Sequence, residues 1–339
     1  MAGDCRGAEK VSDLDRVVAA LRAAPSVAVL AHVRPEADAI GATLGASLAL
    51  RESGKDTAAF NADPLPPGLS CLPGVMDLRR EIPPAGRYAC YLVLDTSDLA
   101  RTGGLLDGRP AGTVVLNVDH HAGNTRFGDV NWVEPEASSA GEMVHRLLRR
   151  AELPISKAVA TNLYAAILTD TGSFQHGNTT PEALRAAADL VACGAAVEDL
   201  SVGMYGNHDP REWYLLSQAL ASLTLIGGGR LAWIDVTLAA REPLGLGLEA
   251  TEGFIDFVRT IGGVQIALMF KEVSASEVRV SIRSRGRVDV AQLAKQFGGG
   301  GHRNAAGCTL REPLAAAEAQ VLAAAEAFLI PDCRFHNAD

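Results

Sequence analysis

The sequence lacks the features that mark several common classes of protein. Its six cysteines form no Cys-x-x-Cys pair, which argues against a zinc ribbon or a dense disulfide framework and favours reduced thiols. No run approaches the roughly 18 apolar residues of a membrane span, and residues 1–10 lack the apolar segment of a signal peptide. We therefore expect a cytoplasmic protein with no membrane partner.

Basic residues are also in short supply. The 339 residues include 31 Lys and Arg against 40 Asp and Glu, which gives a net charge of −9. Long nucleic acid is bound mainly through many Lys and Arg contacts to phosphates, so the composition argues against a partner that is a long duplex. A small phosphorylated ligand is compatible with this charge, because bound divalent cations would supply positive charge where its phosphate sits.

The length and composition predict two globular domains without an internal repeat. The chain exceeds the usual size of one domain, and with 48% hydrophobic and 21% charged residues it can bury two cores. We place a first domain at residues 1–205, a linker helix at 206–222 and a second domain at 223–335.

Short apolar runs that end in an acidic residue or a histidine predict buried strands of a parallel sheet in the first domain. These runs are Ser26 to Ala31, Tyr88 to Leu94 and Thr113 to Val118, which end at His32, Asp95 and Asp119. Helical spacing marks Asp38–Arg51, Ser138–Arg150 and Ser156–Leu168, and Thr180 followed by Pro181 marks the start of another helix.

The second domain shows a different mixture of elements. Strands are predicted at Arg230–Val236, Val264–Phe270 and Glu277–Ile282, and helices at Val288–Gln296 and Pro313–Leu329. The predicted fold class is therefore α/β: a mostly parallel sheet flanked by helices, then a smaller mixed sheet with helices. We expect the active site in the cleft between the two domains.

Acidic residues and histidines gather in four places along the first domain. They are His32 with Glu36 and Asp38, then Asp95, then Asp119 with His120 and His121, then Asp170. A single Asp at a strand end is usually a turn or capping residue, but the carboxyl ends of neighbouring strands face one crevice. Four such groups predict a metal site, and ligands without thiolate favour manganese, iron or magnesium over structural zinc.

Five strings make the sequence resemble the Asp-His-His (DHH/DHHA1) phosphoesterase superfamily, in the branch of nano-RNases, phosphoadenosine-phosphate phosphatases and cyclic-dinucleotide phosphodiesterases. The strings are HVRPEADAIGA at 32–42, LDTSD at 94–98, VDHHAGN at 118–124, TDTGSF at 169–174 and FGGGGHRNAAG at 297–307. They stand in the family's order and cover nearly the whole chain. The resemblance implies a DHH catalytic, metal-binding first domain and a DHHA1 substrate-binding second domain.

The resemblance also implies two divalent metal ions, with Mn²⁺ favoured and Mg²⁺ or Co²⁺ as alternatives. One ion would be held by His32, Glu36 and Asp95, and the other by Asp38, Asp95, His120 and Asp170. The implied catalytic residues are Asp95, which bridges the ions, His121, which faces the substrate phosphate, and Asp119, which orients the imidazoles.

The loop that contains Glu36 departs from the family's pattern. Glu36 stands where the family has Asp, and Ala37 stands where it has Gly. One extra methylene moves the carboxylate outward by about one C–C bond length, whereas metal-ligand distances tolerate only about 0.2 Å. If the loop has not shifted to absorb the longer side chain, we expect a weak first metal site beside an intact second site.

Near the carboxyl end, SIRSRG at 281–286 and GGGGHRNAAG at 298–307 resemble the family's substrate-binding elements. The glycine run is not a P-loop, because no Gly-Lys-Ser/Thr follows it. Glycines let backbone N–H groups approach a phosphate, and Arg offers phosphate a planar fork of donors. The implied substrate-binding residues are Arg283, Ser284, Arg285, Gly299, Gly300, Gly301 and His302.

The function implied is a metal-dependent phosphoesterase that hydrolyses short nucleotides through a water activated by two metals. The candidate substrates are oligoribonucleotides of a few residues, linear or cyclic dinucleotides and 3′-phosphoadenosine 5′-phosphate. Two alternatives stay open: a nucleotide-binding sensor with weakened catalysis because of Glu36, and an enzyme similar to the manganese pyrophosphatases. The family resemblance also makes a homodimer an expectation.

Overall fold

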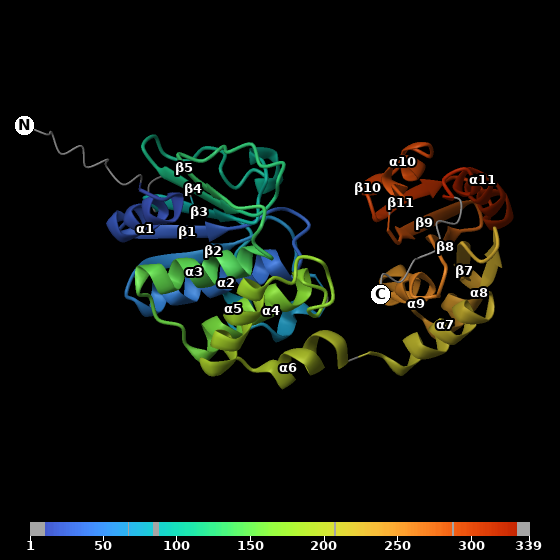
Figure 1. The fold of residues 1–339 in the computed structure, drawn as a ribbon, viewed down its shortest axis with the longest axis horizontal. Coiled ribbons are helices and arrows are strands. Elements are labelled where there is room, and N and C mark those ends of the chain that lie inside the picture. Colours follow the sequence, from blue (N-terminus) through green and yellow to red (C-terminus); the bar gives the residue numbers. More distant parts are fainter. Residues whose placement is uncertain (1–10, 67, 84–87, 207, 287, 331–339) are drawn as a thin grey trace, which may run out of the picture. The chain divides into compact units, whose positions relative to one another are not determined.

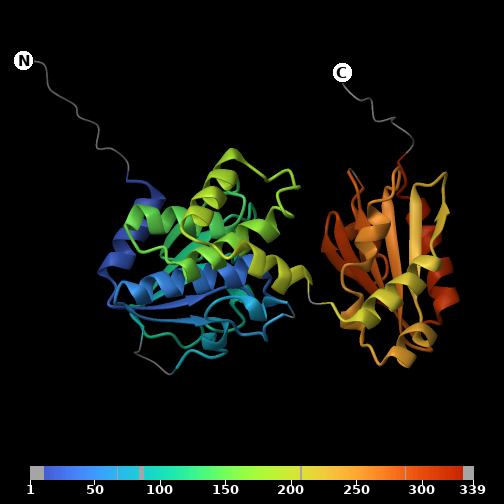
Figure 2. The same ribbon diagram turned by 90° about the horizontal axis from the view of Figure 1, so that it is seen from below.

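The computed structural model describes residues 11–66, 68–83, 88–206, 208–286 and 288–330. Cys5, Cys333 and the end of the predicted second domain at residue 335 lie outside these ranges. The internal contacts divide the chain into two compact units, Met1–Asn207 and His208–Asp339 (Figures 1 and 2). The described residues form no helix that is long and apolar enough to span a membrane.

The first unit is built on a five-stranded sheet in the order β2-β1-β3-β4-β5, in which every neighbouring pair of strands is parallel (Figure 1). Its strands are β1 (Ser26–Leu30), β2 (Asp56–Phe60), β3 (Cys90–Leu94), β4 (Val114–Asp119) and β5 (Val130–Val133). Its helices are α1 (Asp13–Ala23), α2 (Ala37–Glu52), α3 (Ala140–Ala151), α4 (Lys157–Asp170), α5 (Pro181–Ala192) and α6 (Val197–Ser201).

The two faces of this sheet are covered differently. Val27 and Val29 of β1 point into the core that the sheet shares with helices α1 to α5. Ala28 and Leu30 point to the opposite face, where they pack with Leu106 from an irregular segment. Both faces are therefore buried, which explains why these strands are continuous apolar runs that the sequence alone could locate.

Two helices of the first unit pack unusually closely. A Cβ atom at Gly41 of α2 would lie 2.5 Å from the carbonyl oxygen of Asn162 in α4, and one at Gly45 would lie 2.6 Å from the Leu163 side chain. Gly41 also meets Ala166 late in α4, whereas Glu52 at the end of α2 accepts a hydrogen bond at 2.8 Å from Ser156, just before α4, so the helices are antiparallel. This arrangement brings the first turn of α2 beside the last turn of α4.

The second unit contains a six-stranded mixed sheet in the order β10-β11-β9-β8-β7-β6, in which only β7 and β8 are parallel neighbours. Its strands are β6 (Thr224–Ile226), β7 (Leu231–Val236), β8 (Ile266–Ser274), β9 (Glu277–Ser284), β10 (Gly300–His302) and β11 (Ala305–Leu310). Its helices are α7 (Pro210–Ala221), α8 (Leu238–Arg241), α9 (Phe254–Arg259), α10 (Val290–Lys295) and α11 (Leu314–Glu326). The predicted α/β fold class is confirmed.

Helix boundaries differ from the sequence prediction where a cap decides them. The helix predicted from Val288 begins at Val290, because the carboxylate of Asp289 accepts hydrogen bonds from the backbone N–H groups of Ala291 and Gln292. Helix α7, which overlaps the predicted linker, contributes Leu215 and Leu216 to a core of the second unit.

Candidate metal centre

The proposed ligands lie where the order of the first sheet reverses. The chain runs from β1 outward to β2 and then returns to β3 on the other side of β1, and such a switch point is where ligands bind in open α/β sheets. His32 follows β1, Asp95 follows β3 and Asp119 ends β4. All three side chains are buried.

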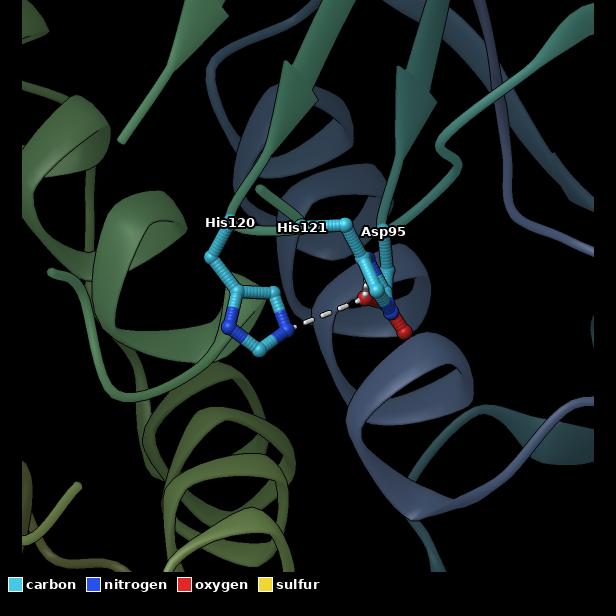
Figure 3. Close-up of side chains that lie close together, drawn as sticks. All are labelled: Asp95, His120 and His121. Atoms are coloured by element: carbon cyan, nitrogen blue, oxygen red, sulfur yellow. Dashed lines mark ion pairs between the residues drawn. The ribbon is translucent and has the colours of Figure 1, made fainter. Parts of the chain in front are cut away.

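Asp95 occupies the centre of the site. Its carboxylate oxygens lie 3.2 Å from Nε2 of His32 and 3.3 Å from Nε2 of His120, and Figure 3 shows the His120 ring directed at Asp95. Burial opposes the ionisation of Asp95, but hydrogen bonds with His120 and His32 hold its pKa well below the ordinary value. Its φ of 51° is rare for a residue with a side chain, and such backbone strain often accompanies a functional site.

Asp38 is held by the start of helix α3. Its Oδ2 accepts a hydrogen bond from the N–H of Ala140 at 2.7 Å, and its Oδ1 accepts one from the N–H of Gly141 at 2.8 Å. These are N–H groups without a partner inside their own helix, and the helix dipole favours a negative charge there. Asp38 Oδ2 also lies 3.7 Å from Nε2 of His120, so its orientation is set from two sides.

Asp170 reaches the same imidazole from the end of helix α4. Its Oδ2 lies 4.0 Å from Nε2 of His120. The helix stops there in a tight turn, in which Gly172, Ser173 and Phe174 all have positive φ. The side chain of Asn178 donates a hydrogen bond to the carbonyl oxygen of Asp170 at 3.1 Å, which fixes this end of the helix at the site.

The carboxylates of the centre compete with each other for protons. Burial raises the pKa of Asp38, and the nearby charges of Asp95 and Asp170 raise it further. Burial likewise raises the pKa of Asp170 to about 6. Burial lowers the pKa of His120, but its bond to Asp95 and the charges of Asp38 and Asp170 outweigh this and raise the value to about 10. Without a cation, the cluster is stabilised by retaining protons.

Metal affinity should therefore depend on pH. A cation must displace the proton of His120 at neutral pH, and below about pH 6 it must also displace that of Asp170. Because each displaced proton costs about tenfold in affinity per pH unit, Mn²⁺ affinity should rise with pH and fall more steeply below about pH 6. Calorimetric titration at several pH values measures this, and Asp170→Asn should lessen the steeper fall, to which Asp38 also contributes because its pKa is raised. Affinity that is constant with pH would contradict the proposed ligands.

The loop after β1 brings a second set of ligands to Asp95. Ligand atoms of His32, Glu36 and Asp95 all lie within 4.8 Å of one another. The loop is fixed in place, because the N–H of Val33 donates to the carbonyl oxygen of Arg101 at 2.7 Å and Asn61 donates to the carbonyl oxygen of His32 at 2.9 Å. Glu36 is exposed, and its side chain makes no capping hydrogen bond with α2, so its carboxylate is available to a metal.

The position of Glu36 leads to a prediction about its length. Since the glutamate carboxylate already lies within reach of His32 and Asp95, Glu36→Asp should withdraw it by about one C–C bond and weaken metal binding at this set by roughly tenfold or more. Calorimetry with Mn²⁺ should show one weakened site and one unchanged site, with lower activity at limiting metal. A tighter first site in the variant would instead support the idea that Glu36 is too long.

Asp119 orients the third imidazole. Its Oδ1 lies 2.8 Å from Nδ1 of His121, and its Oδ2 accepts a hydrogen bond from Asn124 at 2.6 Å. The bond to Asp119 raises the pKa of His121. The His121 side chain is 33% exposed and that of His120 is 16% exposed. His121 is therefore the more accessible of the two neighbouring rings, which Figure 3 labels. This arrangement suits a proton donor to a phosphate oxygen.

The residues fit a pair of divalent cations. Three groups of ligand atoms lie within 4.8 Å of one another: Asp95, His120 and His121; His32, Glu36 and Asp95; and Asp38, His120 and Asp170. Asp95 Oδ1 is buried, with Nε2 of His120 at 3.3 Å and Nδ1 of His121 at 3.6 Å, and a buried carboxylate oxygen is costly unless a cation or proton satisfies it. Carboxylate and imidazole ligands suit manganese or magnesium.

The structure also identifies residues at the centre that the sequence did not single out. Asn178 supports Asp170 and Asn124 supports Asp119. Arg101 places Nη2 at 3.1 Å from Nδ1 of His32. Asn124 stands in one of the quoted strings, but Asn178 and Arg101 are isolated polar residues for which no local pattern indicates a function.

The proposed substrate residues lie on and around the hairpin of β10 and β11 in the second unit. Arg283 is half-buried on β9 and Arg285 is exposed just beyond it. A Cβ atom at Gly299 would collide with the carbonyl oxygen of Gly307, and one at Gly301 with that of Ala305, whereas Gly300 faces open space. Close packing of the strands therefore explains why Gly299 and Gly301 are glycines.

Two residues of the proposed substrate set differ from the others. Ser284 is buried, and its hydroxyl donates a hydrogen bond to the carbonyl oxygen of Val288 at 2.8 Å, so it holds the end of β9 in place. The backbone of His302 lies on β10, where it pairs with Ala305, and its side chain lies outside what the structure describes.

Comparison with known proteins identifies the family. The model of the DHH family N-terminal domain matches residues 26–167, and the model of the DHHA1 domain matches residues 238–330. A Thermus thermophilus protein named bifunctional oligoribonuclease and PAP phosphatase NrnA is 35% identical over 286 residues, which are 84% of this chain and 83% of that protein. The chain belongs to the DHH phosphoesterase family. It is therefore a hydrolase of phosphoester bonds.

Other DHH relatives agree with this placement. A Bacillus subtilis protein with the same name, NrnA, is 27% identical over 82% of this chain and 87% of that protein. The crystal structure of an exopolyphosphatase-related protein from Bacteroides fragilis has a TM-score of 0.83 at 23% identity and covers 94% of this chain and 97% of that one. At this identity, the likeness to the Bacteroides fragilis structure shows a shared fold and nothing further. DHH phosphoesterases depend on metal ions, and the described residues provide candidate ligands for them.

Proposed function

We propose that this protein hydrolyses oligoribonucleotides of a few residues, linear dinucleotides and 3′-phosphoadenosine 5′-phosphate. The observation that carries the proposal is the match to the Thermus thermophilus NrnA, which spans both domains at 35% identity and whose name states oligoribonuclease and PAP phosphatase activities. The excess of acidic residues in the chain supports short substrates over long polymers.

The ligand geometry supports a two-metal mechanism with Mn²⁺ as the favoured metal and Mg²⁺ or Co²⁺ as alternatives. His32, Glu36 and Asp95 would hold one ion, and Asp38, Asp95, His120 and Asp170 the other. Bound divalent ions lower the pKa of water so that hydroxide is available at neutral pH, and they stabilise charge on phosphate oxygens.

The protein's own residues supply orientation and proton handling. Asp95 is shared by both ligand sets, so it fixes their relation to each other. Asp119 holds Nδ1 of His121, which leaves Nε2 as the ring nitrogen that can donate to a phosphate or leaving oxygen. Arg283, Arg285, His302 and the backbone at Gly299, Gly300 and Gly301 are proposed to bind the nucleotide end of the substrate, while Ser284 supports them.

Cyclic dinucleotides are a second candidate substrate class. The supporting relative is the Listeria monocytogenes cyclic-di-AMP phosphodiesterase PdeA, which is 27% identical over 64% of this chain but only 33% of that protein. This support is narrower than that from NrnA. The sensor hypothesis predicts binding without turnover, and the pyrophosphatase hypothesis predicts release of phosphate from pyrophosphate.

A substrate panel tests the proposal directly. Purified protein with Mn²⁺ is offered linear dinucleotides, oligoribonucleotides of increasing length, cyclic dinucleotides, 3′-phosphoadenosine 5′-phosphate and pyrophosphate. We expect mononucleotides from the short linear substrates, AMP from 3′-phosphoadenosine 5′-phosphate and no release from pyrophosphate. Turnover of cyclic dinucleotides alone, or binding without any turnover, would replace the proposed function with one of the alternatives.

A further inference from the structure

One half of the sheet in the second unit has a face without a covering helix. The other half of that face, on β7 and β8, is covered, because Ile234 and Met269 pack there against residues of α7 and α9. The same face continues onto β9 through Arg279, Ser281 and Arg283, because residues two apart on a strand share a face. Arg279 is exposed, and Ser281 and Arg283 are half-buried.

The open face is a groove with a cationic wall and a small-residue floor. Arg279 pairs with Lys271 of β8 on one side and with Thr309 of β11 on the other. The groove has a volume of about 410 Å³. Its lining residues are Lys271, Arg279, Val280, Ser281, Gly298, Gly299, Gly307, Cys308 and Thr309. The glycines carry no side chain that would fill the space beside the two cations.

The positive charges of this face lie outside the ion pairs of the described residues. In the part of the chain that the structure describes, no carboxylate forms an ion pair with Lys271, Arg279 or Arg283. Burial and the charges of Arg279 and Arg283 lower the pKa of Lys271, and Glu252 opposes them only in part. A row of unpaired cations in a chain of net charge −9 favours an anionic ligand.

The spacing of these cations indicates what kind of anion they bind. Arg279 and Arg283 lie four residues apart on β9, which corresponds to about 13 Å between their Cα atoms. This span exceeds the separation of adjacent phosphates on one nucleic-acid strand, so a single phosphate cannot occupy both positions. A chain with several phosphates can, and the side chains of Arg and Lys are suitable partners for its phosphates.

We propose that Lys271 and Arg279 form a second phosphate subsite, separate from Arg283 and His302, that binds the sugar-phosphate backbone of substrates longer than a dinucleotide. This inference rests on the proposed function and deepens it, because it assigns the preference for chain length to particular residues. A dinucleotide would contact only one end of the groove. A trinucleotide or longer substrate would contact both.

The test compares substrates of different length in matched variants. The probes are 5′-phosphorylated oligoadenylates of two to five nucleotides, with KM measured in Mn²⁺ and binding measured in the presence of a chelator. Arg279→Ala and Lys271→Ala should each weaken the trimer and longer probes by roughly tenfold, the loss typical of one charge-assisted contact, and should leave the dimer unchanged. Arg279→Lys should retain most of the binding.

A control variant and a salt series make the test specific. Arg259→Ala removes a positive charge from α9, where Arg259 pairs with exposed Asp256 at 3.0 Å, and it should change no probe. For the tetramer, Arg279→Ala should reduce the slope of log Kd against log salt by about 0.7, the value of one phosphate contact on a single strand. An equal loss for all lengths, or no loss, would overturn the second subsite.

Failure of this inference is distinguishable from failure of the proposed function. If the dinucleotide is not hydrolysed by the unmodified protein, the proposed function fails. Binding of the oligoadenylates in the presence of a chelator still tests the groove in that case. If the dinucleotide is hydrolysed but length dependence is the same in Arg279→Ala and the unmodified protein, only the subsite fails. Competition by an acidic peptide but not by oligoadenylate would assign the groove to a protein partner instead.

Discussion

Replacing Asp95 by asparagine is expected to lower kcat/KM on a dinucleotide by about 10³-fold or more. Asp95 is the one carboxylate that both proposed ligand sets use, and its oxygens lie 3.2 Å from His32 and 3.3 Å from His120. The amide has almost the same shape but carries no charge, so it cannot balance two cations. Steady-state kinetics and calorimetry with Mn²⁺ should show that activity and both metal sites are weakened together.

Asp129→Asn is the matched control for this change. Asp129 also lies beside a strand of the first sheet, where its carboxylate accepts a hydrogen bond from the N–H of Val115 at 2.8 Å. An asparagine oxygen can accept the same bond, and Asp129 is in none of the ligand groups. The control should keep nearly full activity. A fully active Asp95→Asn enzyme would show that this carboxylate is not a shared ligand.

Complete removal of divalent metal is expected to reduce hydrolysis to the uncatalysed rate, and added Mn²⁺ is expected to restore it. The nucleophile of the proposed mechanism is water activated by metal, so removal of the metal removes the nucleophile. The measurement is product release after dialysis against a chelator, followed by titration with Mn²⁺, Mg²⁺ and Co²⁺. Circular dichroism checks that the protein stays folded.

The outcome of this experiment tests the two-metal mechanism, the choice of metal and the effect of Glu36 on the first site. Undiminished hydrolysis after verified metal removal would exclude the two-metal mechanism. Recovery with Mn²⁺ but not with Mg²⁺ would support the choice of metal from the imidazole ligands. A steep dependence on Mn²⁺ concentration, together with one weak site by calorimetry, would support the idea that Glu36 weakens the first site.

The sequence was sufficient for the parts of the fold that depend on local patterns. Asp95 and Asp119 follow apolar runs that are buried on both faces of a parallel sheet, so the runs located both the strands and the carboxylates. The helix predicted at Thr180 and Pro181 is confirmed, because the Thr180 hydroxyl accepts a hydrogen bond from the N–H of Ala183 at 3.1 Å. Caps and buried runs act over a few residues, which makes them predictable.

Features that depend on distant partners were not predictable. His145 is buried in α3, with Nε2 at 2.6 Å from Asp189, which lies 44 residues away. Arg101 and Asn178 reach the metal centre from segments whose sequences carry no distinguishing pattern. Their roles depend on how the loops fold back over the strand ends, and a short window of sequence does not contain that information.

The separate cores of the two units have a consequence for how the protein melts. Each hydrophobic core cluster of the described residues belongs wholly to one unit, so heating need not unfold the chain in a single cooperative step. The proposed metal ligands all lie in the first unit, and a bound ion stabilises only the unit whose native state holds it. A higher cation concentration should therefore raise the melting temperature of the first unit and leave that of the second unit unchanged. A single melting temperature would not describe the protein.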